Sequence, residues 1–80
     1  EDFEAAAFNV FPNPATDAWN ISSSSTITNV AVFDILGKQV ISITPDSNEA
    51  TLNANSLRTG VYFARIDGVN GSKTIKLVKE

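Results

Sequence analysis

Acidic side chains are the residues of this sequence best able to do chemistry, because paired carboxylates catalyse hydrolysis or hold metal ions. Those that fall near predicted turns are dispersed along the chain: Asp34, Asp46, Glu49 and Asp67. The sequence contains no histidine and no cysteine, which removes the commonest general base and the thiolate nucleophile. We therefore expect no catalytic residue, no metal site and no cofactor, and we predict that the chain is not an enzyme.

Other polar or aromatic side chains that could bind a ligand or catalyse a reaction have structural explanations. Asp34 stands three residues before Gly37 and is expected to bond backbone amides of a turn; a calcium ligand is the alternative. Tyr62 follows Gly60 by two residues and is expected to form a structural corner. Trp19 is predicted to point into the core, although a sugar-stacking surface is the other interpretation of a lone tryptophan.

Charge and composition exclude several classes of partner. The 80-residue chain has a formal net charge of −3 and a pI of about 4.7, which disfavours nucleic acid as a partner because its phosphates require clustered cations. The basic cluster in sequence is Lys73, Lys76 and Lys79, which also suits the solubilisation of an edge strand. No apolar run approaches the roughly 20 residues that a membrane-spanning helix needs, and the first residues lack the basic start of a signal peptide. We expect no membrane insertion, and an export signal on a longer precursor if the domain is exported.

Strand patterns recur at roughly ten-residue spacing, which is typical of a small all-β sandwich or barrel. A soft loop is predicted over the serine run at residues 22–25. Residues 1–7 are predicted to be a residual linker, with a helical turn at residues 2–8 as the alternative. We predict about seven antiparallel strands in an immunoglobulin-like β-sandwich over residues 8–80. The expected strands are residues 8–11, 18–22, 27–35, 39–44, 50–53, 61–67 and 72–79.

The segment at residues 57–66 supports the sandwich. It places Tyr62 near the start of a strand, two residues after Gly60 and an irregular stretch. This arrangement resembles the tyrosine corner of immunoglobulin-like domains, in which the phenol hydroxyl bonds the backbone a few residues upstream.

Alternation along the strands assigns the core. The predicted inward side chains are Val10, Trp19, Ile21, Val30, Val32, Val40, Leu52, Leu57, Tyr62, Ala64, Ile66, Ile75 and Leu77. Several apolar side chains fall on the opposite faces, where a half-buried sheet should be polar: Phe11, Phe33, Ile41, Ile43, Phe63 and Val78. Either strand ends, loops and crossovers cover these residues, or they form an apolar surface strip that docks another protein.

Three motifs in order resemble the C-terminal sorting domain of the type IX secretion system (the Por secretion system) of Bacteroidota. Residues 8–14 (FNVFPNP) match its opening motif, with a strand that runs into Pro12, Asn13 and Pro14. Residues 30–40 (VAVFDILGKQV) match its middle motif, and residues 57–63 (LRTGVYF) with the lysine-bearing strand match its closing motif.

The resemblance implies a sorting signal that directs the export of a cargo protein, which precedes it in the same precursor. The implied partners are the outer-membrane translocon and a sortase-like cysteine peptidase, which commonly removes the signal near or within the segment before Phe8. The implied location is the periplasm in transit, then the cell surface or the extracellular space. Recognition is expected at the last strand, at the turn after Asp34 or on the apolar strip; the candidates are Phe33, Gly37, Lys38, Phe63, Lys73, Lys76 and Lys79.

Two other functions remain open from the sequence. A passive fibronectin-like spacer of a secreted enzyme would tolerate replacement by an unrelated sandwich. A small carbohydrate-binding module would require Trp19 to be exposed.

Overall fold

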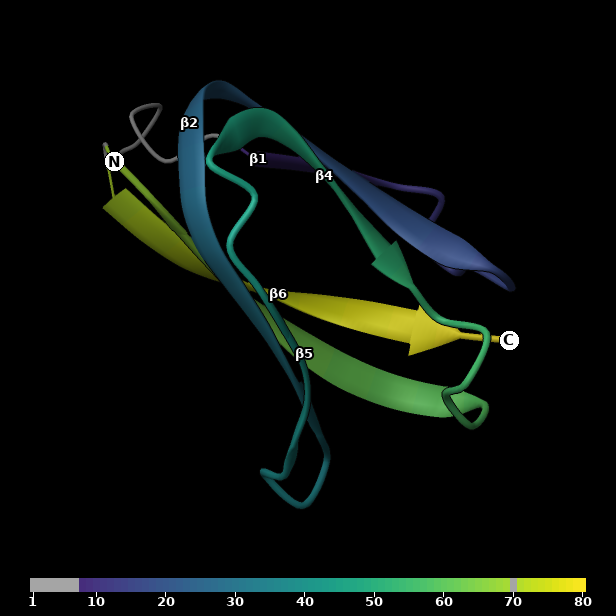
Figure 1. Ribbon diagram of the computed structural model, residues 1–80. Helices are drawn as coiled ribbons and strands as arrows, with labels where there is room; N and C mark the ends of the chain where they lie inside the picture. Colours follow the sequence, from purple (N-terminus) through teal and green to yellow (C-terminus); the bar gives the residue numbers. More distant parts are fainter. Residues whose placement is uncertain (1–7, 70) are drawn as a thin grey trace.

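Antiparallel strands build the whole domain in the computed structural model, which describes residues 8–69 and 71–80 (Figure 1). The linker predicted over residues 1–7 lies outside the described residues, and Phe8, the last residue of the alternative helical turn, begins a strand instead. Within the described part the strands number six: β1 (Phe8–Phe11), β2 (Ala18–Asp34), β3 (Gln39–Ile43), β4 (Ser47–Asn53), β5 (Gly60–Gly68) and β6 (Gly71–Lys79).

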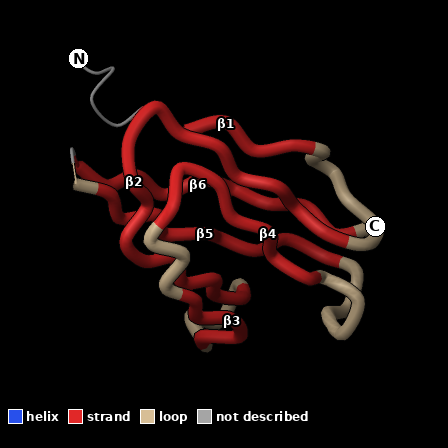
Figure 2. The backbone as a smooth tube through the Cα atoms, turned by 45° about the horizontal axis from the view of Figure 1, so that its top comes forward, coloured by secondary structure: helices blue, strands red, loops and turns tan. Residues whose placement is uncertain are grey.

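The long strand β2 belongs to two layers of one curled sheet. Its first half, residues 18–23, pairs with β1 on one side and β4 on the other. Its second half, residues 27–34, pairs with β3 and β5, and β5 pairs with β6. We call β1, the first half of β2 and β4 the first layer, and β3, the second half of β2, β5 and β6 the second layer. The two views show β2 curving from one layer to the other (Figures 1 and 2).

The predicted all-β, immunoglobulin-like class is confirmed, but the predicted loop over the serine run is wrong. Residues 22–25 lie inside β2, so the two strands predicted at 18–22 and 27–35 are halves of one strand. Serine is a poor strand former, but pairing with two neighbouring strands keeps this segment in the β conformation. Ser22 lies opposite Asn9 of β1 and Glu49 of β4. The register shifts of both β4 and β5 fall after this point, where β2 changes layer.

The core lies between the two layers. Trp19 of the first layer contacts Tyr62 of the second edge to face, with ring centroids 6.2 Å apart. Both side chains are buried, as the alternation predicted. The other predicted inward residues are either buried or half-buried against this core. Buried members that the alternation missed are Phe8, Ala15, Ile27, Ala50 and Ala54.

Two residues predicted to face outward belong to the core side instead. Ile41 and Ile43 lie opposite the buried Val32 and Val30 and pack against the core cluster. The register of β2 and β3 shifts between Val32 and Phe33. The alternation of inward and outward side chains therefore changes phase along this hairpin. The outward assignment of these two isoleucines was therefore wrong.

Candidate functional site

The tyrosine corner forms as predicted at the start of β5. The Tyr62 hydroxyl donates a hydrogen bond of 2.7 Å to the carbonyl oxygen of Arg58, four residues upstream. Arg58 thus contributes only its carbonyl oxygen to this bond, and its side chain is exposed to solvent. The bond fixes residues 58–60 against the first turn of the strand.

The turn between β2 and β3 is fastened by Asp34, also as predicted. Its Oδ1 accepts hydrogen bonds of 2.9 Å from the backbone N–H groups of Leu36 and Lys38. The N–H of Gly37 donates to the carbonyl oxygen of Asp34 at 3.0 Å, and Gly37 adopts a φ of 86°, which favours glycine. This ordered turn presents two apolar side chains to solvent: Ile35 is 71% exposed and Leu36 is 89% exposed.

Asn13, between the two prolines of the opening motif, reaches the last strand. Its Nδ2 donates a hydrogen bond of 2.9 Å to the carbonyl oxygen of Lys76. Its Oδ1 accepts one of 2.9 Å from the N–H of Val78. One side-chain amide therefore imitates the donor and acceptor of a neighbouring strand.

The residues after the second proline continue this pairing. The N–H of Ala15 donates to the carbonyl oxygen of Val78 at 3.0 Å, and the N–H of Glu80 donates to the carbonyl oxygen of Ala15 at 2.8 Å. The segment lies beside the end of β6 (Figure 2). Residues 12–15 thus cover the outer edge of β6 over its second half, which closes that stretch to pairing with another chain.

The outer face of the second layer brings three of the predicted recognition residues into one row. Phe33 of β2 lies opposite Phe63 of β5, which lies opposite Lys76 of β6. Phe63 is 38% exposed and Phe33 is half-buried. In the neighbouring row, Val61 lies opposite Val78. Of the six apolar residues predicted on outward positions, this face therefore holds Phe63, which is exposed, and Phe33 and Val78, which are half-buried.

The three lysines of β6 do not form one patch. Lys76 shares the outer face with Phe63, whereas Lys73 and Lys79 fall on the alternate positions that Leu77 occupies. They stand six residues apart, near opposite ends of the strand. The other two candidates, Gly37 and Lys38, lie in the β2–β3 turn, both exposed.

Sequence reasoning missed the turn and corner side chains that border this face. Ile35, Leu36, Arg58 and Val61 are among the residues that line a shallow hollow of about 320 Å³. A second hollow, of about 400 Å³, shares Arg58 with the first in its lining and includes Lys38. An isoleucine and a leucine at a tight turn, where polar residues are usual, were the available signal.

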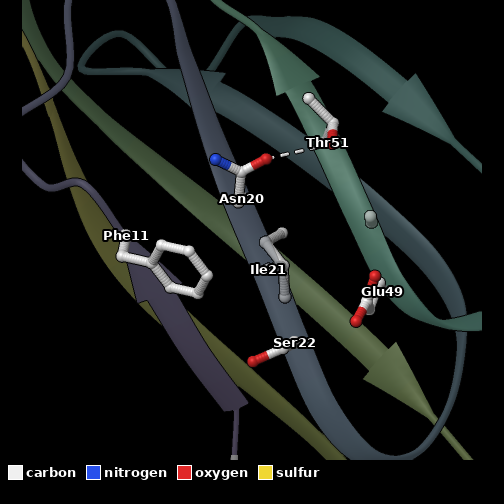
Figure 3. Close-up of a pocket in the computed structure, with 7 residues that line it drawn as sticks. Phe11, Asn20, Ile21, Ser22, Glu49 and Thr51 are labelled. Carbon is white, nitrogen blue, oxygen red and sulfur yellow. Dashed lines mark hydrogen bonds between the residues drawn. The ribbon is translucent and has the colours of Figure 1, made fainter.

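A third hollow lies on the outer face of the first layer (Figure 3). It measures about 200 Å³, and its lining includes Phe11, Asn20, Glu49 and Thr51. The Thr51 hydroxyl donates to Oδ1 of Asn20 at 3.1 Å, and the Phe11 ring lies on the β1 side of the pair. Trp19 is fully buried instead, so the sugar-stacking surface considered for it is wrong.

Residues 8–69 and 71–80 contain no group of three or more acidic side chains that could hold a metal ion. Within the same ranges we find no helix of the length and apolarity needed to cross a bilayer.

Comparison with known proteins agrees with the geometry. The family model of the secretion system C-terminal sorting domain matches residues 9–80. No curated protein matches the chain.

Among solved structures, the chain is similar to PorZ, described as an essential bacterial surface component of the type-IX secretion system of human oral-microbiomic Porphyromonas gingivalis. The TM-score is 0.75 at 22% identity, over 92% of the present chain and 11% of the PorZ chain. At that identity the likeness shows the fold alone.

Proposed function

This chain belongs to the family of secretion system C-terminal sorting domains, the sorting signals of type IX secretion, and we propose that its folded surface is what the translocon recognises. Proteins that carry such signals are exported across the outer membrane to the cell surface or the extracellular space, and the family is not catalytic. The domain would therefore act as a label and perform no reaction.

The contact of Asn13 with β6 carries this proposal. The opening motif of the family and its closing strand are separated by more than sixty positions, and Asn13 bonds Lys76 and Val78 across that separation. Only a folded chain brings the two motifs together. A receptor that reads both would therefore read a shape instead of a linear sequence.

The recognition surface in this proposal is the outer face of the second layer with the adjoining turn. Phe33, Phe63 and Lys76 would form its centre, because they lie in one cross-strand row. The Gly37–Lys38 turn would border it, and Lys73 and Lys79 would contribute from the alternate face of β6.

The remaining parts of the proposal concern the precursor. The described domain would follow a cargo protein, with residues 1–7 as a linker that holds or adjoins the site cut by the sortase-like cysteine peptidase. The precursor would cross the periplasm with this domain folded. The absence of cysteine suits that route, since folding then needs no oxidation step.

Fusion to a reporter tests the proposal. Residues 1–80 are placed behind a fluorescent protein that carries its own signal for export to the periplasm. The fusion is then followed in cells with and without a working type IX translocon. We expect surface delivery only in the cells with the translocon; equal delivery in both, or retention in both, would contradict the proposal.

A spacer gives a different result in the same cells. If the domain were a passive fibronectin-like module, an unrelated sandwich in its place would support the same delivery. We expect that replacement to leave the reporter in the periplasm. Deletion of residues 76–80 should do the same, because it removes the partners of Asn13 together with part of the surface.

A further inference from the structure

Positive charge is confined to one layer of the domain. All six basic residues of the chain lie in the second layer or in the turns next to it: Lys38, Arg58, Arg65, Lys73, Lys76 and Lys79. Within the strands of the first layer the charged side chain is Glu49 of β4, and Asp17 and Asp46 lie in the connections that lead into β2 and β4. The described residues contain six acidic groups in all, so this segregation exists in a part of the chain with no net charge.

Two acidic side chains of the second layer already form hydrogen bonds or an ion pair within the domain. Oδ1 of Asp34 accepts two turn amides, and Asp67 pairs with Arg65 at 3.3 Å. Ion pairs between described residues do not involve Lys38, Arg58 or Lys76. Within residues 8–69 and 71–80, these three cations are therefore among those on this layer that no carboxylate pairs with.

The same cations alternate with exposed apolar side chains. Lys76 adjoins Phe63, which adjoins Phe33. Arg58 lines the hollow that Ile35 and Leu36 also line, and it lines the neighbouring hollow with Lys38. We call these residues, together with Val61, the basic–apolar face: Phe33, Ile35, Leu36, Lys38, Arg58, Val61, Phe63 and Lys76.

We propose that the basic–apolar face binds an acidic protein segment that carries apolar side chains. Carboxylates of the segment pair with Lys38, Arg58 and Lys76, and its apolar side chains cover Phe63 and enter the hollow beside Leu36. The inference rests on the proposed function, since the segment would belong to the outer-membrane machinery that reads the signal.

Two features of this face favour an acidic protein segment with apolar side chains: its positive charges and the apolar side chains beside them. A polyanion such as lipopolysaccharide or nucleic acid is held by clustered cations alone, whereas here exposed apolar side chains lie beside Arg58 and Lys76. Burial of apolar surface supplies the attraction, and the charges supply orientation and rejection of basic partners.

The side chains of Arg58 and Lys76 can be changed without touching the bonds that hold the fold. Arg58 contacts Tyr62, and Lys76 contacts Asn13, in each case through the backbone oxygen. The test variant is Arg58→Gln with Lys76→Gln, in the reporter fusion described above. The control is Asn48→Asp with Asn53→Asp on β4, which changes the net charge by the same amount on the first layer and keeps the oxygen of residue 53 that the N–H of Asn55 bonds.

We expect the glutamine pair to reduce surface delivery by about tenfold, because two complementary charges are lost. We expect the control pair to deliver within about twofold of the wild-type fusion, because no complementary contact is removed. The melting temperature of each purified domain shows whether it remains folded. Full delivery of the glutamine pair, or an equal loss in the control pair, would overturn the inference. Translocon-dependent delivery of the wild-type fusion would still support the proposed function.

Photocrosslinking identifies the class of partner. A benzophenone amino acid replaces Phe63 in the purified domain, and another sample carries it at Phe11 on the first layer. Each domain is irradiated with detergent-solubilised outer membranes from cells that have the translocon.

We expect position 63 to form an adduct with a protein component of the translocon, and position 11 to form none. The yield should fall about tenfold or more between 50 and 500 mM salt, because exposed ion pairs are screened. An adduct with lipopolysaccharide, an adduct insensitive to salt, or no adduct at position 63 would each overturn the inference.

Discussion

Asn13→Ala is the substitution that most sharply tests how the two ends of the sequence are held together. It removes the side-chain amide that bonds the carbonyl oxygen of Lys76 and the N–H of Val78, each at 2.9 Å. The bonds of Ala15 to the same strand are made by the backbone and are not removed directly. The variant therefore isolates the contribution of one side chain to the closure of the β6 edge.

The expected cost follows from the number and exposure of the lost bonds. A typical hydrogen bond contributes about 0.5–1.5 kcal/mol net, and both of these are exposed, so their sum is about 1–2 kcal/mol. In a domain of this size, a loss of about 1 kcal/mol lowers the melting temperature by roughly 4–8 °C. We expect the melting temperature of Asn13→Ala to fall by roughly 5–15 °C.

Amide hydrogen exchange measured by NMR locates the effect. Val78 N–H has Asn13 Oδ1 as its acceptor, so we expect its exchange in Asn13→Ala to accelerate about tenfold or more. The Leu77 amide lies on the β5-facing side of the same strand and should change less. Asn13→Asp retains an oxygen for Val78 but loses the donor to Lys76, so Val78 should stay protected in that variant.

Two results would refute this account. The first is an Asn13→Ala domain whose melting temperature and whose Val78 amide exchange rate both equal those of the wild type. The second is equal acceleration of Val78 in the alanine and aspartate variants, which would mean that the oxygen of residue 13 does not bond this amide.

Three further substitutions test the corner, the turn and the hairpin. Tyr62→Phe removes the hydrogen bond to Arg58 and should lower the free energy of unfolding by about 1 kcal/mol; an unchanged denaturation midpoint would show that the bond contributes nothing. Asp34→Ala removes the acceptor of two turn amides and should cost about 1–2 kcal/mol in urea denaturation, with a stability equal to wild type counting against this role. Gly68→Ala would place a Cβ 3.0 Å from the backbone oxygen of Thr26 and should destabilise the domain by about 1–3 kcal/mol; a more stable variant by calorimetry would contradict that crowding.

Local chemistry in the sequence predicted the parts of the fold that local interactions decide. The corner at Tyr62 and the turn at Asp34 each close within four residues. Turn residues and alternation therefore carried enough information to identify them. Trp19 was placed in the core for the same reason, since its neighbours on β2 alternate.

The parts that the sequence did not predict depend on pairing between distant segments. The serine run joins β2 because β1 and β4 pair with Ser22, which local propensity opposes. Ile41 and Ile43 face the core because the register shifts next to Phe33. Neither pairing partner nor register can be obtained from one strand alone.

The candidate site was predicted in part for the same reason. Phe33 and Phe63 were recognised as apolar residues on outward positions, but their pairing in one row required the topology. Lys73, Lys76 and Lys79 form a cluster in the sequence, and strand alternation places Lys76 on a different face from the other two. The contact of Asn13 with β6 has no local signal at all, because a polar residue between two prolines predicts only a turn.

The central claim is that the translocon reads the folded domain, and Trp19→Asp in the reporter fusion tests it most directly. Trp19 lies outside the three sequence motifs, so all of them remain intact, while a charge in the core should unfold the domain. The amounts of fusion in the periplasm and on the cell surface are measured in cells with a working translocon, and circular dichroism of the purified domain verifies unfolding. We predict that the unfolded fusion reaches the periplasm and stays there; surface delivery at the wild-type level would contradict the account, because the linear motifs would then suffice.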